Sequence, residues 1–228
     1  MLENVLHWIG FGLCHQLPER SFFGGAVQVP VCARDTGIYV GFLVSILVIA
    51  ALQRSRPTGL PNLGVSVLLG AMVLWMAIDG VSSYAGLRET TNALRLLTGL
   101  MAGYAMGAVA LPLINDELWR SASSERVLPR WTTTLVWLAS LALAFACIYW
   151  LAPLLGAVYP LLVAGFILGT LTAVNLLIVL LVPAFDRRAD RLADAWLPLV
   201  LAFGLSWLEI ILSALVKLAL VGLAGPGG

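Results

Sequence analysis

The sequence predicts an all-α integral membrane protein, built as a polytopic bundle of about six transmembrane helices. Hydrophobic residues make up 61% of the 228 residues and charged residues only 11%, against about 25% charged residues in soluble domains. Apolar runs of about 20 residues also recur along the chain, and a helix of that length crosses the hydrocarbon core of a bilayer. The formal net charge of +1 gives no basic surface for nucleic acid, so a nucleic-acid partner is not expected.

The N-terminal segment, residues 2–15, is apolar but too short to cross a bilayer. We therefore expect a short interfacial or re-entrant helix here, followed by a polar loop. Residues 1–35 form this N-terminal unit, which holds both histidines and two of the three cysteines. Residues 36–228 form the six-span part of what we interpret as a single membrane domain.

Six apolar segments are long enough to be transmembrane helices. They lie at residues 36–52, 63–85, 93–114, 132–153, 158–182 and 196–217. The first of them is the shortest. No repeat, low-complexity tract or soluble domain is evident between them.

The orientation in the membrane follows from the arginines, because short loops rich in arginine stay in the cytoplasm. Arginines cluster in the loops after spans one, three and five: Arg54, Arg56, Arg120, Arg126, Arg130, Arg187, Arg188 and Arg191. These loops are expected inside. Both termini and the connection at 86–92 are then expected outside, although that connection carries Arg88. We expect a multi-pass protein of the cell's inner (plasma) membrane.

Polar residues near the outer ends of spans two and three form the first candidate site. Asp79 lies inside span two, where an acidic group is costly unless it is paired or hydrated. Arg88, Asn92 and Arg95 follow at spacings that place them on one face of span three. One interpretation is a buried Asp79–Arg95 salt bridge that holds the two spans in register. The other is an anion site, in which the arginines and Asn92 bind a phosphate or carboxylate while Asp79 orients them or acts as a catalytic base.

Gly99, Gly103 and Gly107 recur at four-residue steps along span three. Such a stripe of small residues lets a neighbouring helix approach closely. We interpret these glycines as packing residues.

The N-terminal unit contains the second candidate site. Cys14, His15, Cys32 and Asp35 offer two thiolates, an imidazole and a carboxylate, a ligand set that Zn²⁺ accepts. Adjacent Cys14 and His15 diverge by about 100° on a helix, so both can bind one ion only where the helix ends; Pro18 makes such an end plausible. Two alternatives remain open: no metal, with a Cys14–Cys32 disulfide, and a role for Asp35 as the N-cap of the first span.

Several segments of the chain carry a recognisable pattern: CHQ at 14–16, PERSF at 18–22, CARDTGIY at 32–39, DG at 79–80 and GLRxxxNxLRxxTG at 86–99, where x is any residue. Over about residues 12–107 this pattern resembles the signature of a family of small prokaryotic membrane proteins catalogued as domain of unknown function 2085. The resemblance implies no particular activity. Many members of that family have cysteine at the position of Asp35, which favours metal binding in the family and leaves this chain an oxygen ligand instead.

The last three spans carry two polar residues inside the membrane, Asn175 and Glu209. A carboxylate near the middle of a span is costly in lipid, so Glu209 is expected to face the bundle interior and bond a partner such as Asn175. The pair is either a structural contact or part of a proton or ion relay.

The leading functional hypothesis is a membrane enzyme. A metal held by Cys14 and Cys32, with His15 and Asp35, would polarise a bond or activate water. Four arginines would hold the anionic head group of a phosphorylated membrane lipid or another anionic small molecule: Arg20, Arg34, Arg88 and Arg95. The catalytic candidates are His15 and Asp79.

Two other classes of function remain open. A transporter or permease would use Asp79 and Glu209 as coupling groups. A non-catalytic subunit or assembly factor of a membrane complex would present the N-terminal loop, closed by a disulfide, as a docking surface. The sequence does not define the oligomeric state or the complex partner.

The orientation is testable by cysteine labelling. We predict that Arg56→Cys and Arg188→Cys variants gain no label from an impermeant thiol reagent added to intact cells, relative to the unsubstituted chain, because both positions lie in arginine-rich cytoplasmic loops. A Glu89→Cys variant should gain label. The opposite pattern would place the N-terminal unit in the cytoplasm.

Overall fold

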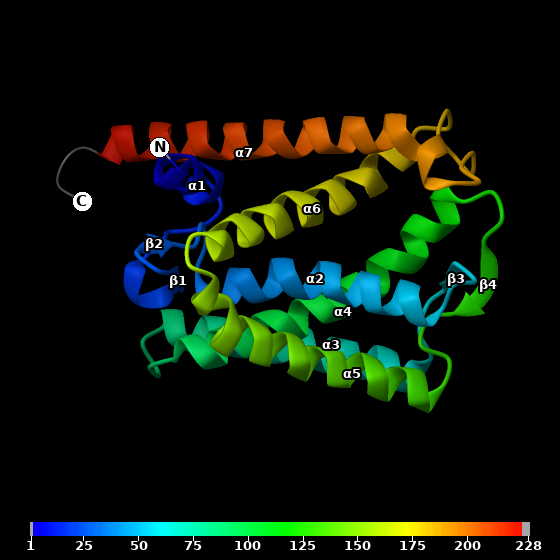
Figure 1. Cartoon of the computed structure of the whole chain (residues 1–228), viewed down its shortest axis with the longest axis horizontal. Helices are drawn as coiled ribbons and strands as arrows, with labels where there is room; N and C mark the ends of the chain where they lie inside the picture. Colours follow the sequence, from blue (N-terminus) through cyan, green and yellow to red (C-terminus); the bar gives the residue numbers. More distant parts are fainter. Residues whose placement is uncertain (1, 225–228) are drawn as a thin grey trace.

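The computed structural model of the chain describes residues 2–224 and is almost entirely helical (Figure 1). The α-helices are α1 Leu2–Phe11, α2 Ala33–Leu52, α3 Leu63–Tyr84, α4 Asn92–Leu118, α5 Trp131–Ala146, α6 Val158–Leu180 and α7 Trp196–Ala224. Helices α2 to α7, with α5 continued to Leu155, provide six segments long and apolar enough to cross a membrane. The predicted all-α membrane bundle is confirmed, and the bounds of the predicted spans agree with these helices to within about four residues, except that α7 continues past its predicted end at 217 to Ala224.

Short strands and 3-10 turns occupy the connections. The strands are β1 Phe23–Gly24, β2 Val27–Gln28, β3 Pro57–Gly59 and β4 Ser123–Arg126, and the turns between helices include Pro18–Arg20 and Leu192–Ala195. Strands β1 and β2 form an antiparallel hairpin, whereas β3 and β4 pair in parallel. The two strand pairs lie at opposite ends of the bundle (Figure 1).

Helix α2 begins three residues earlier than the sequence predicted. Cys32 has an extended backbone, and its carbonyl oxygen accepts the N–H of Thr36 at 2.9 Å, so Cys32 is the N-cap. Asp35 therefore lies within the first turn, and its predicted role as N-cap is wrong. The reason is that its carboxylate accepts a hydrogen bond from the Cys32 thiol at 3.2 Å instead of capping the backbone.

The span that begins with α5 changes its helix type after α5 ends. A π-helical segment, Cys147–Leu151, follows it, and a 3-10 turn, Ala152–Leu155, completes the span. The chain then reverses at Gly156, whose φ of +56° suits glycine because it has no Cβ. This change of winding carries the span to Leu155.

Successive spans run in opposite directions, so the connections between them lie at the two opposite ends of the bundle (Figure 1). The N-terminal unit, the α3–α4 connection and the C-terminal part of α7 share one end. The arginine-rich connections all lie at the end that carries β3 and β4. The structure thus brings residues 1–35, as far as they are described, and the 86–92 connection to the same end, as the sequence predicted.

The centre of the bundle is the close packing of α2 against α4. A Cβ added at Gly99, Gly103 or Gly107 would lie 2.0, 2.3 or 2.5 Å from a backbone oxygen of α2. Gly37 and Gly41 of α2 are equally confined by the backbone of α4. The predicted packing role of the glycine stripe is confirmed, and glycines of the partner helix complete it.

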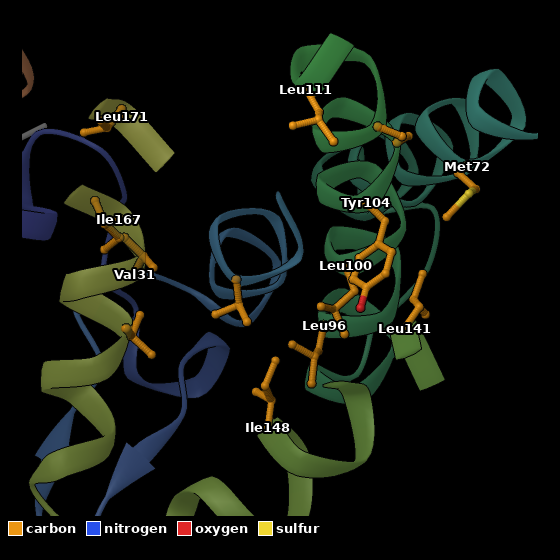
Figure 2. Close-up of a cluster of buried hydrophobic side chains, with 14 of the residues drawn as sticks. Val31, Met72, Leu96, Leu100, Tyr104, Leu111, Leu141, Ile148, Ile167 and Leu171 are labelled. Atoms are coloured by element: carbon orange, nitrogen blue, oxygen red, sulfur yellow. The ribbon is translucent and has the colours of Figure 1, made fainter. Parts of the chain in front are cut away.

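Larger side chains pack around this helix pair. In Figure 2, Leu96, Leu100 and Tyr104 of α4 lie on one side of α2, and Ile167 of α6 lies on the other. Trp137 of α5 is fully buried, and its indole N–H donates to Ser45 Oγ of α2 at 2.9 Å. Helix α2 therefore lies at the centre of the bundle, with α4, α5 and α6 packed around it.

We predict that Gly103→Ala destabilises the protein by roughly 1–3 kcal/mol, because the new methyl group must push apart two backbones already in contact. Gly165→Ala in α6 is the matched control, since a Cβ there meets nothing within 4 Å. Thermal unfolding in detergent should show a lower midpoint for Gly103→Ala only. Equal midpoints for the two variants would contradict the backbone contact as the central restraint.

Candidate functional site

Asp79 of α3 is fully buried and is the centre of a polar cluster. Its Oδ2 accepts hydrogen bonds from Arg34 Nη2 and, at 3.2 Å, from Thr98 Oγ1. Its Oδ1 accepts from Arg88 Nη2 and, at 3.4 Å, from Thr90 Oγ1. Two guanidinium groups and two hydroxyls thus surround one carboxylate, and they connect α2, α3 and the start of α4.

The predicted salt bridge between Asp79 and Arg95 is wrong. Asp79 pairs with Arg34 and Arg88, whereas Arg95 Nη1 donates to Asn92 Oδ1 at 3.2 Å. The cause is the close packing of α2 and α4, since the backbone carbonyl of Arg34 lies against Gly99. That contact brings the Arg34 side chain to the carboxylate.

Asn92, a predicted anion ligand, instead holds the N-terminal loop. Its Nδ2 donates to the carbonyl oxygens of Glu19 and Ser21 at 3.2 and 3.4 Å. Its Oδ1 accepts from Arg95. The first residue of α4 therefore fastens the loop and orients an arginine at the same time.

Cys14, Cys32 and Asp35 form the second cluster. The two thiol sulfurs and a carboxylate oxygen of Asp35 lie within 4.8 Å of one another. The Cys32 N–H donates to Cys14 Sγ at 3.3 Å, and both thiols are free. Cys14 follows the end of α1, while Cys32 and Asp35 belong to the start of α2. Three of the four predicted metal ligands are thus brought together.

The two thiols differ in acidity. A hydrogen bond with Cys32 lowers the pKa of the Cys14 thiol, and this effect exceeds the opposing effect of burial. The same interaction, followed by burial and the nearby Asp35 charge, raises the pKa of Cys32. The geometry agrees, because Cys14 Sγ accepts the Cys32 N–H whereas the Cys32 thiol donates to the Asp35 carboxylate.

His15, the fourth predicted ligand, lies outside the group of three. It is exposed and follows α1 directly after Cys14, so the predicted helix end is confirmed but the imidazole does not join the thiols. It instead lines a cavity beside them. A role for His15 in binding metal stays a prediction.

The cavity beside the thiols connects the two clusters. It has a volume of about 80 Å³, and its lining includes Cys14, His15, Cys32, Arg20, Arg34 and Arg95. Arg34 is paired with Asp79, but among the described residues Arg20 and Arg95 form no ion pair. The Arg20 guanidinium lies 5.8 Å from the centre of the Tyr84 ring, which also lines the cavity. Two uncompensated positive charges in a small cavity favour an anionic occupant.

Sequence reasoning missed several residues of the site. Thr90 and Thr98 bond Asp79, and Ser82 Oγ accepts from Arg88 Nε at 2.8 Å. Thr98 follows Arg95 by three residues, so helical periodicity could have placed it on the same face. Lys217, the only lysine of the chain, gave no such signal. Its Nζ donates to the carbonyl oxygens of Phe11 and Cys14 at 2.6 and 2.9 Å.

The predicted contact between Asn175 and Glu209 is confirmed, because Asn175 Nδ2 donates to Glu209 Oε2 at 3.2 Å. The prediction that Glu209 faces the bundle interior is wrong, since its side chain is exposed. Helix α7 packs on the rest of the bundle mainly through α6, and Glu209 lies at the margin of that contact and lines a furrow with Cys14 and His15.

Comparison with known proteins gives a consistent picture. A family model described as "Predicted membrane protein (DUF2085)" matches residues 14–109. An uncharacterized protein of Methanocaldococcus jannaschii is 34% identical over 108 residues, which are 47% of this chain and 67% of that protein. An uncharacterized protein of Methanothermobacter thermautotrophicus is 35% identical over 102 residues, 42% of this chain and 83% of that protein. No solved structure matches significantly. The matched region holds both clusters of the site.

We predict that Asp79→Ala destabilises the protein by about 3–5 kcal/mol, because it leaves the buried Arg34 guanidinium without a counter-charge. Arg88→Ala should be milder, since the Arg88 side chain is 39% exposed and water can replace its contacts. Asp190→Ala, which breaks an exposed pair with Arg120, is the control and should cost about 0–1 kcal/mol. Thermal unfolding in detergent measures this order; an Asp79→Ala midpoint close to that of Asp190→Ala would contradict it.

Proposed function

Since the chain belongs to the family of predicted membrane proteins called DUF2085, we propose its function from the chemistry of its site: a metal-dependent membrane enzyme that acts on a phosphorylated lipid. The metal would be Zn²⁺, held by Cys14, Cys32 and Asp35. The phosphate would bind in the adjoining cavity, among the arginines.

One observation carries the proposal: a thiol-rich ligand group opens onto a cavity lined by three guanidinium groups. Catalytic zinc sites use three protein ligands and keep a fourth position for water or substrate. Small movements would bring the ligand atoms of Cys14, Cys32 and Asp35, now within 4.8 Å of one another, to zinc distances of about 2.0–2.3 Å. Purely structural zinc sites have four protein ligands, so a group of three favours chemistry.

The residues around the cavity suit phosphate-ester hydrolysis. Arg20, Arg34 and Arg95 would bind the phosphate oxygens and stabilise the charge that develops on them. A bound zinc ion supplies Lewis-acid polarisation of the reacting groups. The oxygen of water forms a bond to phosphorus, and the bond from phosphorus to the lipid alcohol oxygen breaks. His15, at the cavity wall, would take the proton from water and return it to the departing alcohol.

Asp79 has a positioning role in this proposal. Its carboxylate accepts hydrogen bonds from four side chains, and Asp79 is not among the residues that line the cavity. It holds Arg34 at the cavity wall. These four hydrogen bonds to a buried carboxylate also disfavour the transporter alternative, in which Asp79 would exchange a proton or an ion with water.

We place the site at the extracytoplasmic surface of the cell's inner membrane. The support is the charge distribution: eight arginines lie in the connections at the opposite end, and loops rich in arginine stay in the cytoplasm. The lipid head group would therefore reach the site from the outer leaflet.

We predict that the purified protein contains about one zinc ion per chain, and that Cys14→Ser or Cys32→Ser reduces this content to near zero, because a three-ligand site loses most of its affinity with one thiolate. Cys147→Ser, whose cysteine lies in the π-helical segment away from the site, is the matched control and should retain the metal. Elemental analysis under non-reducing conditions provides the measurement.

The same experiment separates the alternatives. Wild-type protein without metal but with a Cys14–Cys32 disulfide on a non-reducing gel would instead favour the non-catalytic subunit with a stapled docking loop. Two thiols that are alkylated independently, in protein that holds no metal, would end the metal proposal.

A further inference from the structure

A furrow of about 560 Å³ runs along α7 next to the candidate site. One wall is a single face of α7, whose lining residues follow the helical spacing: Glu209, Leu212, Ser213, Val216, Lys217 and Leu220. Its other wall is the chain from Gly12 to His15. Three residues of the α7 wall are apolar, Leu212, Val216 and Leu220, and three are polar, Glu209, Ser213 and Lys217.

The two walls of the furrow are held together at one place. A Cβ added at Gly12 would lie 2.3 Å from Ser213 Oγ, so the N-terminal segment touches α7 directly. Lys217 adds two hydrogen bonds, to the carbonyl oxygens of Phe11 and Cys14. The position of Cys14 is therefore tied to α7, and the width of the furrow is fixed.

The furrow and the arginine cavity adjoin, since Cys14 and His15 line both. The cavity of about 80 Å³ is small beside the roughly 300–1,000 Å³ of ordinary ligand pockets. It has room for a phosphate group but not for the rest of a lipid. The remainder of any such substrate must leave the cavity through an adjoining space.

The direction of the furrow suits a hydrocarbon chain. From Leu220 to Glu209 it extends about 16 Å at the helical rise of 1.5 Å per residue. It starts at the end of the bundle that carries the N-terminal unit and finishes near the middle of α7 (Figure 1). A lipid chain that enters the membrane from that surface follows the same path. Glu209, bonded to Asn175, lies at the inner end of the α7 wall.

Resting on the proposed function, we infer that the furrow holds the hydrocarbon chain of the substrate, so that the substrate is a long-chain lipid with a terminal phosphate. The phosphate lies among Arg20, Arg34 and Arg95, and the chain lies over Leu212, Val216 and Leu220. These three side chains are more than half exposed. Bulk bilayer lipid would also cover them, so the adjoining arginine cavity is the feature that favours a phosphorylated lipid at this place.

The test is photo-cross-linking in lipid nanodiscs with a phosphatidate that carries a diazirine in its acyl chain. The label is expected to concentrate on residues 12–15 and 209–220. Val216→Trp and Leu212→Trp fill the furrow at two depths, and each should reduce this labelling by about tenfold, because the displaced methylenes lose their burial. Leu208→Trp, an equally exposed position of α7 outside the furrow lining, is the matched control and should label like wild type.

Two further arms identify the ligand. A phosphatidylcholine probe with the same chain should label the furrow less than the phosphatidate probe, and excess inorganic phosphate should not displace the phosphatidate. Equal labelling by both lipids would overturn the placement of the phosphate among the arginines. Labelling spread over all helices, with Val216→Trp and Leu212→Trp behaving like Leu208→Trp, would overturn the furrow as the chain site.

The failure of this inference is distinguishable from failure of the proposed function. Zinc content is measured on the same samples. Localised labelling of a protein that holds no zinc would leave the furrow as a lipid-binding site and remove the metal-dependent reaction. Zinc in the protein with unlocalised labelling would leave the metal site and remove the furrow.

Discussion

The backbone contact between α2 and α4 is the constraint on which the rest of the structure depends. Gly99, Gly103 and Gly107 face backbone oxygens of α2 at distances that no side chain would tolerate. In a membrane, where apolar side chains gain little by leaving lipid for protein, such close contact is a main source of helix association. It also determines the site: the first turn of α2, with Cys32, Arg34 and Asp35, is fixed against the first turns of α4.

The buried charge of Asp79 is stable because this contact supplies its partners. An isolated carboxylate inside a membrane protein is costly, but two guanidinium groups and two hydroxyls donate to this one. Arg34 and Arg88 pair with Asp79, whereas Arg20 and Arg95 pair with no carboxylate among residues 2–224. The same cluster that stabilises the helix bundle therefore leaves positive charge at the cavity, which is the property that the proposed function requires.

Helix α7 contributes to the site although it lies outside the region that matches the family. The matched residues, 14–109, contain both clusters but end within α4. Lys217 nevertheless holds the backbone of Cys14, and α7 forms one wall of the furrow beside it. The last span thus acts on the group formed by Cys14, Cys32 and Asp35 through the backbone of the N-terminal unit.

The sequence by itself determined the fold class, the six spans, the packing role of the glycines and the cysteines, arginines and aspartates at the centre of the site. These follow from composition, length and helical periodicity, which are local properties of the chain. It could not determine that Asp79 pairs with Arg34 rather than Arg95, that Asn92 binds the loop, or that Lys217 reaches Cys14. Those contacts depend on how closely two helices approach and how they are rotated, and residues far apart in sequence meet only then. The tertiary structure alone decided them: the glycine contacts with α4 set the depth and rotation of α2 and bring Arg34 to Asp79, and the packing of α7 brings Lys217 to the N-terminal unit.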